Sequence, residues 1–222
     1  MPHPTSDHPE NRRAAAARAL ERLIQGNRRF AAGGLLDDKI TPERRAEAAG
    51  EQNPKAVVLG CVDARVPPEL VLGQGIGDLL TVRTAGQSLS GVALGSLEFG
   101  VRQLGVPLVV VLGHTSCGAV LAAIGGGPIT GHLGELIGEV AGRLVDVVGD
   151  DPIRATGGNV EATVRALREL GTLEYGSDAA HVVGMVYDLQ TGLVTVVDDA
   201  GLLAGEGPGG AAGAPPAPRV GD

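Results

Sequence analysis

Short apolar runs rich in valine recur along the chain, and most are followed by glycine or by a polar residue. Because β-branched residues in runs of this length are typical of buried strands, the pattern predicts several strands. They cover residues 55–60, 79–83, 107–112, 181–189 and 193–197. The last two flank Gln190-Thr191-Gly192, which predicts a short hairpin turn.

The segments between these runs carry apolar residues at helical spacing. They predict helices over residues 11–32, 42–49, 68–72, 90–104, 118–124, 133–148 and 159–170. Thr41 and Asn159 are the expected N-caps of two of them, since their side chains can accept hydrogen bonds from first-turn amides. Strand, helix and strand in succession predict parallel pairing, and therefore an α/β fold.

Composition indicates one globular domain with disordered ends. At 222 residues and 43% hydrophobic content the chain can bury a core of its own. We expect residues 1–10 to be disordered, residues 11–200 to form a single domain, and the Gly/Pro/Ala-rich residues 201–222 to form a disordered tail.

Charge and hydropathy exclude several classes of function. A net charge of −8 without a basic patch argues against a nucleic-acid partner. No apolar run is long enough to cross a membrane, and no targeting signal is visible, so we expect a cytoplasmic protein. In that compartment the two cysteines are expected to be thiols, metal ligands or redox groups rather than a structural disulfide.

Both cysteines lie where predicted strands end. Cys61 follows the first strand, and the third strand leads into His114 and Cys117. Zinc prefers thiolate and imidazole ligands, and catalytic zinc sites keep one position open. Three such ligands without an obvious fourth therefore favour an open, reactive zinc site. Spacing alone also allows two buried thiols beside a structural histidine.

Asp63 and Arg65 alternate with Cys61, so in an extended segment the three side chains point the same way. Arg65 can then hold the Asp63 carboxylate through a bidentate pair. Two roles for Asp63 stay open: it could be the fourth zinc ligand, or it could accept a hydrogen bond from a zinc-bound water. In the second case activity should rise towards alkaline pH.

The segment from Cys61 to Glu69, with Gly113 to Val120, resembles the β-class carbonic anhydrases. The resemblance extends over roughly residues 21–198 and includes the segments 75–79, 82–86, 96–99, 131–134 and 184–188. It implies a mostly parallel central sheet of four to five strands flanked by helices, with an N-terminal helical arm. It also implies a homodimer or homotetramer with exchanged N-terminal helices.

The same resemblance implies an activity and a set of site residues. One Zn²⁺ per chain would be held by Cys61, His114 and Cys117, Asp63 and Arg65 would control the fourth position, and a zinc-bound hydroxide would convert CO2 to bicarbonate. The substrate pocket implied by the family's pattern consists of Gln52, Leu80, Phe99 and the backbone amide of Gly118, with Leu80 and Phe99 partly across a dimer interface.

Two departures from the family's pattern are visible. Gln87 stands where asparagine is common, and the chain has no Trp, a residue of the inhibitory bicarbonate pocket in some members. Two alternative functions stay open. The same scaffold could hydrolyse carbonyl sulfide or carbon disulfide, or the chain could be a non-catalytic zinc-binding or bicarbonate-sensing module.

Overall fold

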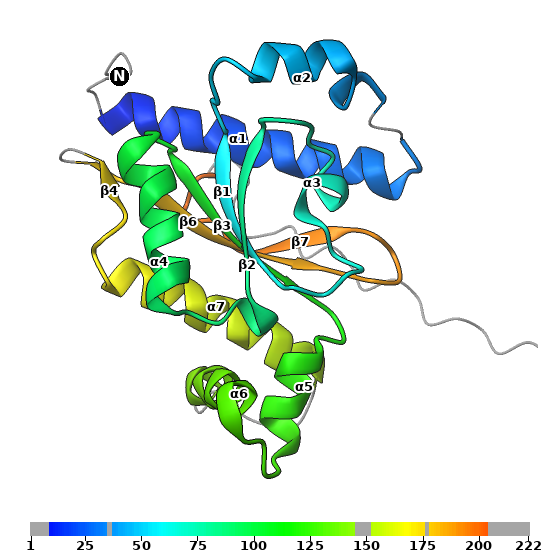
Figure 1. Cartoon of the computed structure of the whole chain (residues 1–222), viewed down its shortest axis with the longest axis vertical. Helices are drawn as coiled ribbons and strands as arrows, with labels where there is room; N and C mark the ends of the chain where they lie inside the picture. Colours follow the sequence, from blue (N-terminus) through cyan, green and yellow to red (C-terminus); the bar gives the residue numbers. More distant parts are fainter. Residues whose placement is uncertain (1–8, 35–36, 145–151, 176–177, 204–222) are drawn as a thin grey trace, which may run out of the picture.

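The computed structural model describes residues 9–34, 37–144, 152–175 and 178–203, and within them it contains a five-stranded sheet in the order β2-β1-β3-β6-β7 (Figure 1). The strands are β1 (Ala56–Gly60), β2 (Leu79–Arg83), β3 (Leu108–His114), β6 (His181–Tyr187) and β7 (Val194–Asp198). The first four pair in parallel, and β7 is antiparallel to β6. The predicted α/β class and mostly parallel sheet are confirmed.

Seven α-helices lie within the described residues: α1 (Pro9–Ala31), α2 (Pro42–Ala48), α3 (Pro68–Val71), α4 (Gly91–Glu98), α5 (Gly118–Gly125), α6 (Gly131–Arg143) and α7 (Pro152–Glu169). Short 3-10 turns occur at η1 (Asp37–Lys39) and η2 (Ala85–Gln87), and a π turn, η3 (Phe99–Gln103), extends α4. A two-stranded hairpin of β4 (Glu174–Tyr175) and β5 (Asp178–Ala179) was not predicted. Among the described helices, none is both long and apolar enough to cross a bilayer.

Helices cover both faces of the sheet. The sheet is buried on one face by α1 and α3, and on the other by α4 and α7 (Figure 1). Leu20 and Leu23 of α1 pack in one core cluster with Val58 and Val110. The opposite cluster contains side chains of β1, β3, α4 and α7, including Val57, Leu59, Val109, Leu97 and Val160. Continuous burial along β1 and β3 follows, as expected for central parallel strands.

A smaller cluster lies beyond the carboxyl ends of the strands. There α5 and α6 pack together (Figure 1), and Val120, Val140 and Leu144 surround the two cysteines. The N-terminal arm divides into two parts. α1 packs on the sheet of its own chain, whereas α2 buries none of its residues.

Several predicted boundaries were wrong. α7 begins at Pro152, so Asn159 lies inside the helix and is fully buried rather than capping it. Pro9 and Glu10 are helical, because α1 begins two residues before the predicted start at residue 11. Leu202, which falls in the predicted tail, is buried in the core cluster that also contains side chains of α1. Residues 1–8 and 204–222 of the predicted disordered ends, and Val147 and Val148 of the predicted sixth helix, lie outside the described residues.

The crossing of α1 over the end of α3 depends on two glycines. A Cβ on Gly26 would lie 2.0 Å from the Leu72 carbonyl oxygen, and one on Gly73 would lie 2.5 Å from the Gly26 oxygen. Because both obstacles are backbone atoms, neither can be relieved by a change of rotamer.

We expect Gly26→Ala to destabilise the fold by about 1–3 kcal/mol, because α1 must move away from α3. Gly138→Ala is the matched control, since Gly138 is an exposed position inside α6 with open space around its Cβ. That change should stabilise the protein by up to about 1 kcal/mol. Urea unfolding of both variants measures the difference, and equal stabilities would contradict the close-approach explanation.

Candidate metal centre

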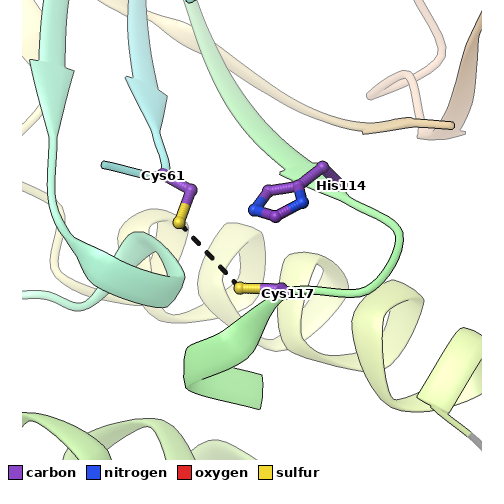
Figure 2. Close-up of side chains that lie close together, drawn as sticks. All are labelled: Cys61, His114 and Cys117. Atoms are coloured by element: carbon purple, nitrogen blue, oxygen red, sulfur yellow. Dashed lines mark hydrogen bonds between the residues drawn. The ribbon is translucent and has the colours of Figure 1, made fainter. Parts of the chain in front are cut away.

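Three potential metal ligands converge at the carboxyl ends of β1 and β3. Cys61 directly follows β1, His114 is the last residue of β3, and Cys117 is the N-cap of α5 (Figure 2). Their ligand atoms all lie within 4.8 Å of one another, and the two sulfur atoms are 3.9 Å apart. All three side chains are buried. The structure therefore brings together the three residues whose spacing suggested a zinc site.

The tautomer of His114 is set by its own turn. Its Nδ1 lies 2.9 Å from the Thr115 carbonyl oxygen, so Nδ1 carries the proton and donates it. The Nε2 atom is buried and has no hydrogen-bond partner among the described residues. A buried lone pair without a donor, facing two thiols, suits a metal ion. Cys61, His114 and Cys117 thus fit the zinc ion that the donor set implies.

The two thiols differ in acidity even without a metal. The hydrogen bond from Cys117 holds the pKa of Cys61 well below its ordinary value, and the same hydrogen bond raises the pKa of Cys117. The Gly86 amide also donates to the Cys61 sulfur, at 3.4 Å. Cys61 is therefore the thiol that loses its proton more readily, and a divalent ion bound there would favour deprotonation of both.

Asp63 and Arg65 form the bidentate pair expected from their spacing. The Arg65 guanidinium donates from Nε to Oδ1 at 2.9 Å and from Nη2 to Oδ2 at 2.6 Å. These hydrogen bonds hold the pKa of Asp63 far below its ordinary value. Oδ2 also lies 3.9 Å from Nε2 of His114. The carboxylate is consequently ionised and stands beside the metal-binding atoms, with both of its oxygens bound by Arg65.

Arg83 is a supporting residue that the sequence analysis missed. It ends β2, and it donates from Nε to the Cys61 carbonyl and from Nη2 to the Asp63 carbonyl, both at 2.7 Å. It thereby fixes the backbone that carries both site residues. The signal was present in the segment 82–86, which belongs to the family's pattern, but the role depends on the pairing of Arg83 with Gly60.

The four expected substrate-pocket residues do not all reach this centre within one chain. Gly118 does, since it begins α5 next to Cys117 and is exposed. Gln52 is exposed and precedes β1, whose five residues span about 16 Å before Cys61. Leu80 pairs with Val57 and so lies about 10 Å before the strand end.

Leu80 and Phe99 line a separate surface hollow of about 550 Å³ on the outer side of β2 and α4. The remaining lining residues are Thr81, Val82, Val92, Gly95 and Ser96. In a single chain, therefore, Leu80 and Gln52 both lie well before the strand ends that carry the metal-binding atoms.

Comparisons with known proteins identify relatives of the chain and of its fold. Residues 56–194 match the family model described as carbonic anhydrase. The chain is 38% identical over 202 residues to carbonic anhydrase 2 of Mycobacterium tuberculosis, covering 85% of this chain and 96% of that protein. A β-carbonic anhydrase structure from Aspergillus fumigatus has a TM-score of 0.62 and 28% identity, and covers 70% of this chain and 80% of that one.

Two further solved structures share the fold. A structure of tetrameric β-carbonic anhydrases from Sordaria macrospora has a TM-score of 0.59 at 25% identity, with 70% of this chain and 86% of that one covered. A carbon disulfide hydrolase has a TM-score of 0.51 at 19% identity, with 69% and 86% covered. At that identity the second likeness extends to the fold alone.

Proposed function

The chain belongs to the β class of carbonic anhydrases, and from this premise we propose that it catalyses the reversible hydration of CO2 to bicarbonate with one zinc ion per chain. Cys61, His114 and Cys117 would hold the ion. The observation that carries the proposal is the convergence of exactly these three ligand atoms beside an Asp63 carboxylate that Arg65 has already bound.

When bound, zinc lowers the pKa of a coordinated water to about 7 and so supplies hydroxide near neutral pH. Asp63 would orient that water, and two observations support this role: its carboxylate is ionised, and its Oδ2 lies 3.9 Å from Nε2 of His114. Arg65 binds both oxygens of the carboxylate and offsets its charge, so a zinc-bound water would lose its proton more readily than it would beside an unpaired carboxylate.

The beginning of α5 would receive the product. Gly118 is exposed, has no Cβ, and places its amide at a helix N-terminus, where partial positive charge favours an oxygen anion. A bicarbonate oxygen could therefore accept a hydrogen bond there.

The pKa of Asp63 lies far below neutrality, so Asp63 remains ionised from pH 6 to pH 9 and contributes no titration to the rate in this range.

We expect stopped-flow measurement on zinc-quantified protein to find CO2 hydration that is faster at pH 8.5 than at pH 7.

Arg65→Ala should keep its zinc and lose roughly tenfold to a thousandfold in kcat, because the positioning of Asp63 is lost. Arg165→Ala is the control, since Arg165 is an exposed arginine of α7.

Each alternative has its own outcome in this experiment. Full zinc occupancy without CO2 turnover would contradict the proposal and favour a sensing module. Turnover of carbon disulfide or carbonyl sulfide in place of CO2 would favour the hydrolase. An Arg65→Ala protein with the full rate would leave the enzyme standing but refute the role assigned to Asp63 and Arg65.

For the assembly, we infer that chains associate through the hollow beside β2 and that the partner completes the active site. Three features support this. β2 is an edge strand, whose unpaired backbone groups natural proteins usually cover. Val92 and Phe99 in the hollow are 84% and 48% exposed. Gln52 is too far from the centre of its own chain to contact substrate there, so in this proposal it serves the centre of a partner.

We expect Val92→Asp to shift the protein towards monomers and to lower CO2 hydration by roughly tenfold or more, because positioning groups from the partner are lost. Its zinc content should not change. Leu133→Asp is the matched control, since Leu133 is 59% exposed but lies on α6, away from the hollow. Light scattering gives the mass, and a fully active monomeric Val92→Asp protein would contradict the inference.

A further inference from the structure

A buried polar cluster connects the η2 loop to α6 and α7 next to the metal centre, and it has no part in the proposed reaction. It joins the loop at η2 to two helices that contribute no metal ligand: Glu139 and Arg143 come from α6, and Asn159 comes from α7. Asn159 and the loop residue Gln87 are almost completely buried, at 0% and 1% exposure. The Arg143 side chain is 11% exposed.

The contacts of this cluster converge on one residue, Gly86. Its carbonyl oxygen accepts hydrogen bonds from Asn159 Nδ2 at 2.9 Å and from Arg143 Nη2 at 3.4 Å. Its amide, on the other side, donates to the Cys61 sulfur at 3.4 Å. Side chains from α6 and α7 thus hold the carbonyl group of Gly86, while its amide group contacts the metal ligand Cys61.

The loop needs such support because its backbone is unfavourable. Gly86 and Gln87 have φ values of 62° and 55°, and a glutamine in the left-handed region is uncommon. Asn159 also donates to Gln87 Oε1 at 3.2 Å, and Glu139 accepts from the Leu89 amide at 3.2 Å while pairing with Arg143. The cluster therefore holds the loop at Gly86 and at two positions that follow it, Gln87 and Leu89.

Stability alone does not account for the cluster. Among the described residues, four of its buried polar atoms have no hydrogen-bond partner: Gln87 Nε2, Glu139 Oε2, Arg143 Nε and Asn159 Oδ1. Buried polar groups that are only partly satisfied destabilise a fold, and apolar residues of similar size are often tolerated in their place. A cluster with this cost is better explained by what it positions.

We propose that Asn159, together with the Glu139–Arg143 pair, is a positioning device that holds the Gly86 amide on the Cys61 sulfur and thereby tunes the metal affinity of the site. The inference rests on the metal site of the proposed function but not on its turnover. Hydrogen bonds to a ligating sulfur withdraw electron density from it and fix its direction, and outer contacts of this kind commonly change metal affinity by about tenfold to 100-fold.

The test compares Asn159→Leu, which keeps the volume but cannot donate, with wild type in full-length protein. Zinc affinity is measured by chelator competition, and the sulfur-to-cobalt charge-transfer band is recorded on protein loaded with Co²⁺. We expect zinc affinity to fall by about tenfold to 100-fold, because the Cys61 sulfur is no longer held in position towards the other two ligands, and this loss outweighs its stronger electron donation. The charge-transfer band should move to longer wavelength, because a sulfur without its amide donor gives up electron density more easily.

Thr163→Val is the matched control. Thr163 is equally buried in α7, and its hydroxyl donates only to the Asn159 backbone carbonyl within the helix. It should keep the wild-type band and affinity. If Asn159→Leu fails to fold, Glu139→Leu combined with Arg143→Met removes the second hold on Gly86 without leaving an unpaired charge, and should shift the band in the same direction.

The outcomes separate this inference from the proposed function. A folded Asn159→Leu protein with the wild-type band and affinity would overturn it, as would an equal shift in Thr163→Val. If Asn159→Leu does not fold, the inference would be overturned by a wild-type band in the protein that combines Glu139→Leu with Arg143→Met. Wild-type protein that binds zinc tightly but does not hydrate CO2 would refute the proposed function and leave the inference standing.

Discussion

The parallel pairing of β1 with β3 is the constraint on which the rest of the site depends. Gly60 lies opposite Leu112, so the chain leaves β1 at Cys61 while β3 continues for two more residues to His114. A shift of one residue in this register would turn every side chain of one strand to the other face of the sheet. The valine-rich core on both faces therefore fixes the distance between the Cys61 thiol and the His114 imidazole.

Electrostatics around these strand ends follow from the same geometry. β2 pairs with the other side of β1 and ends at Arg83, which holds the Cys61 and Asp63 carbonyls. With that backbone fixed, Arg65 can hold the Asp63 carboxylate by two hydrogen bonds. The centre thus has a thiol of lowered pKa, an ionised carboxylate and an imidazole with its lone pair free, each set by a neighbour rather than by exposure to water.

Much of the fold could be predicted from the sequence, because the information was local. Valine-rich runs gave the strands of the main sheet, and the ligands were recognisable because each follows such a run. The start of α7 could not be predicted in this way. Asn159 has the side chain of a good N-cap, and only its tertiary contacts show that it occupies a buried position inside the helix. The role of Arg83 likewise depends on strand pairing, which composition and spacing do not encode.

The substrate-pocket residues illustrate a different limit. Gln52, Leu80 and Phe99 were identified only through resemblance to a family, and one chain does not bring them to the metal-binding atoms. A pattern within one sequence predicts contacts within that chain, whereas a pocket completed by a second copy depends on the symmetry of an assembly. The metal-binding atoms and the Asp63–Arg65 pair, by contrast, are complete within a single chain.

The most direct test of the central claim is a crystal structure of the zinc-loaded protein at pH 8.5, with anomalous data collected at the zinc edge. The account predicts one zinc ion per chain, bound by the sulfurs of Cys61 and Cys117 and by Nε2 of His114. Both oxygens of Asp63 should remain on Arg65, outside the coordination sphere. An Asp63 oxygen bound directly to zinc at that pH, or an anomalous peak away from these three ligands, would contradict it.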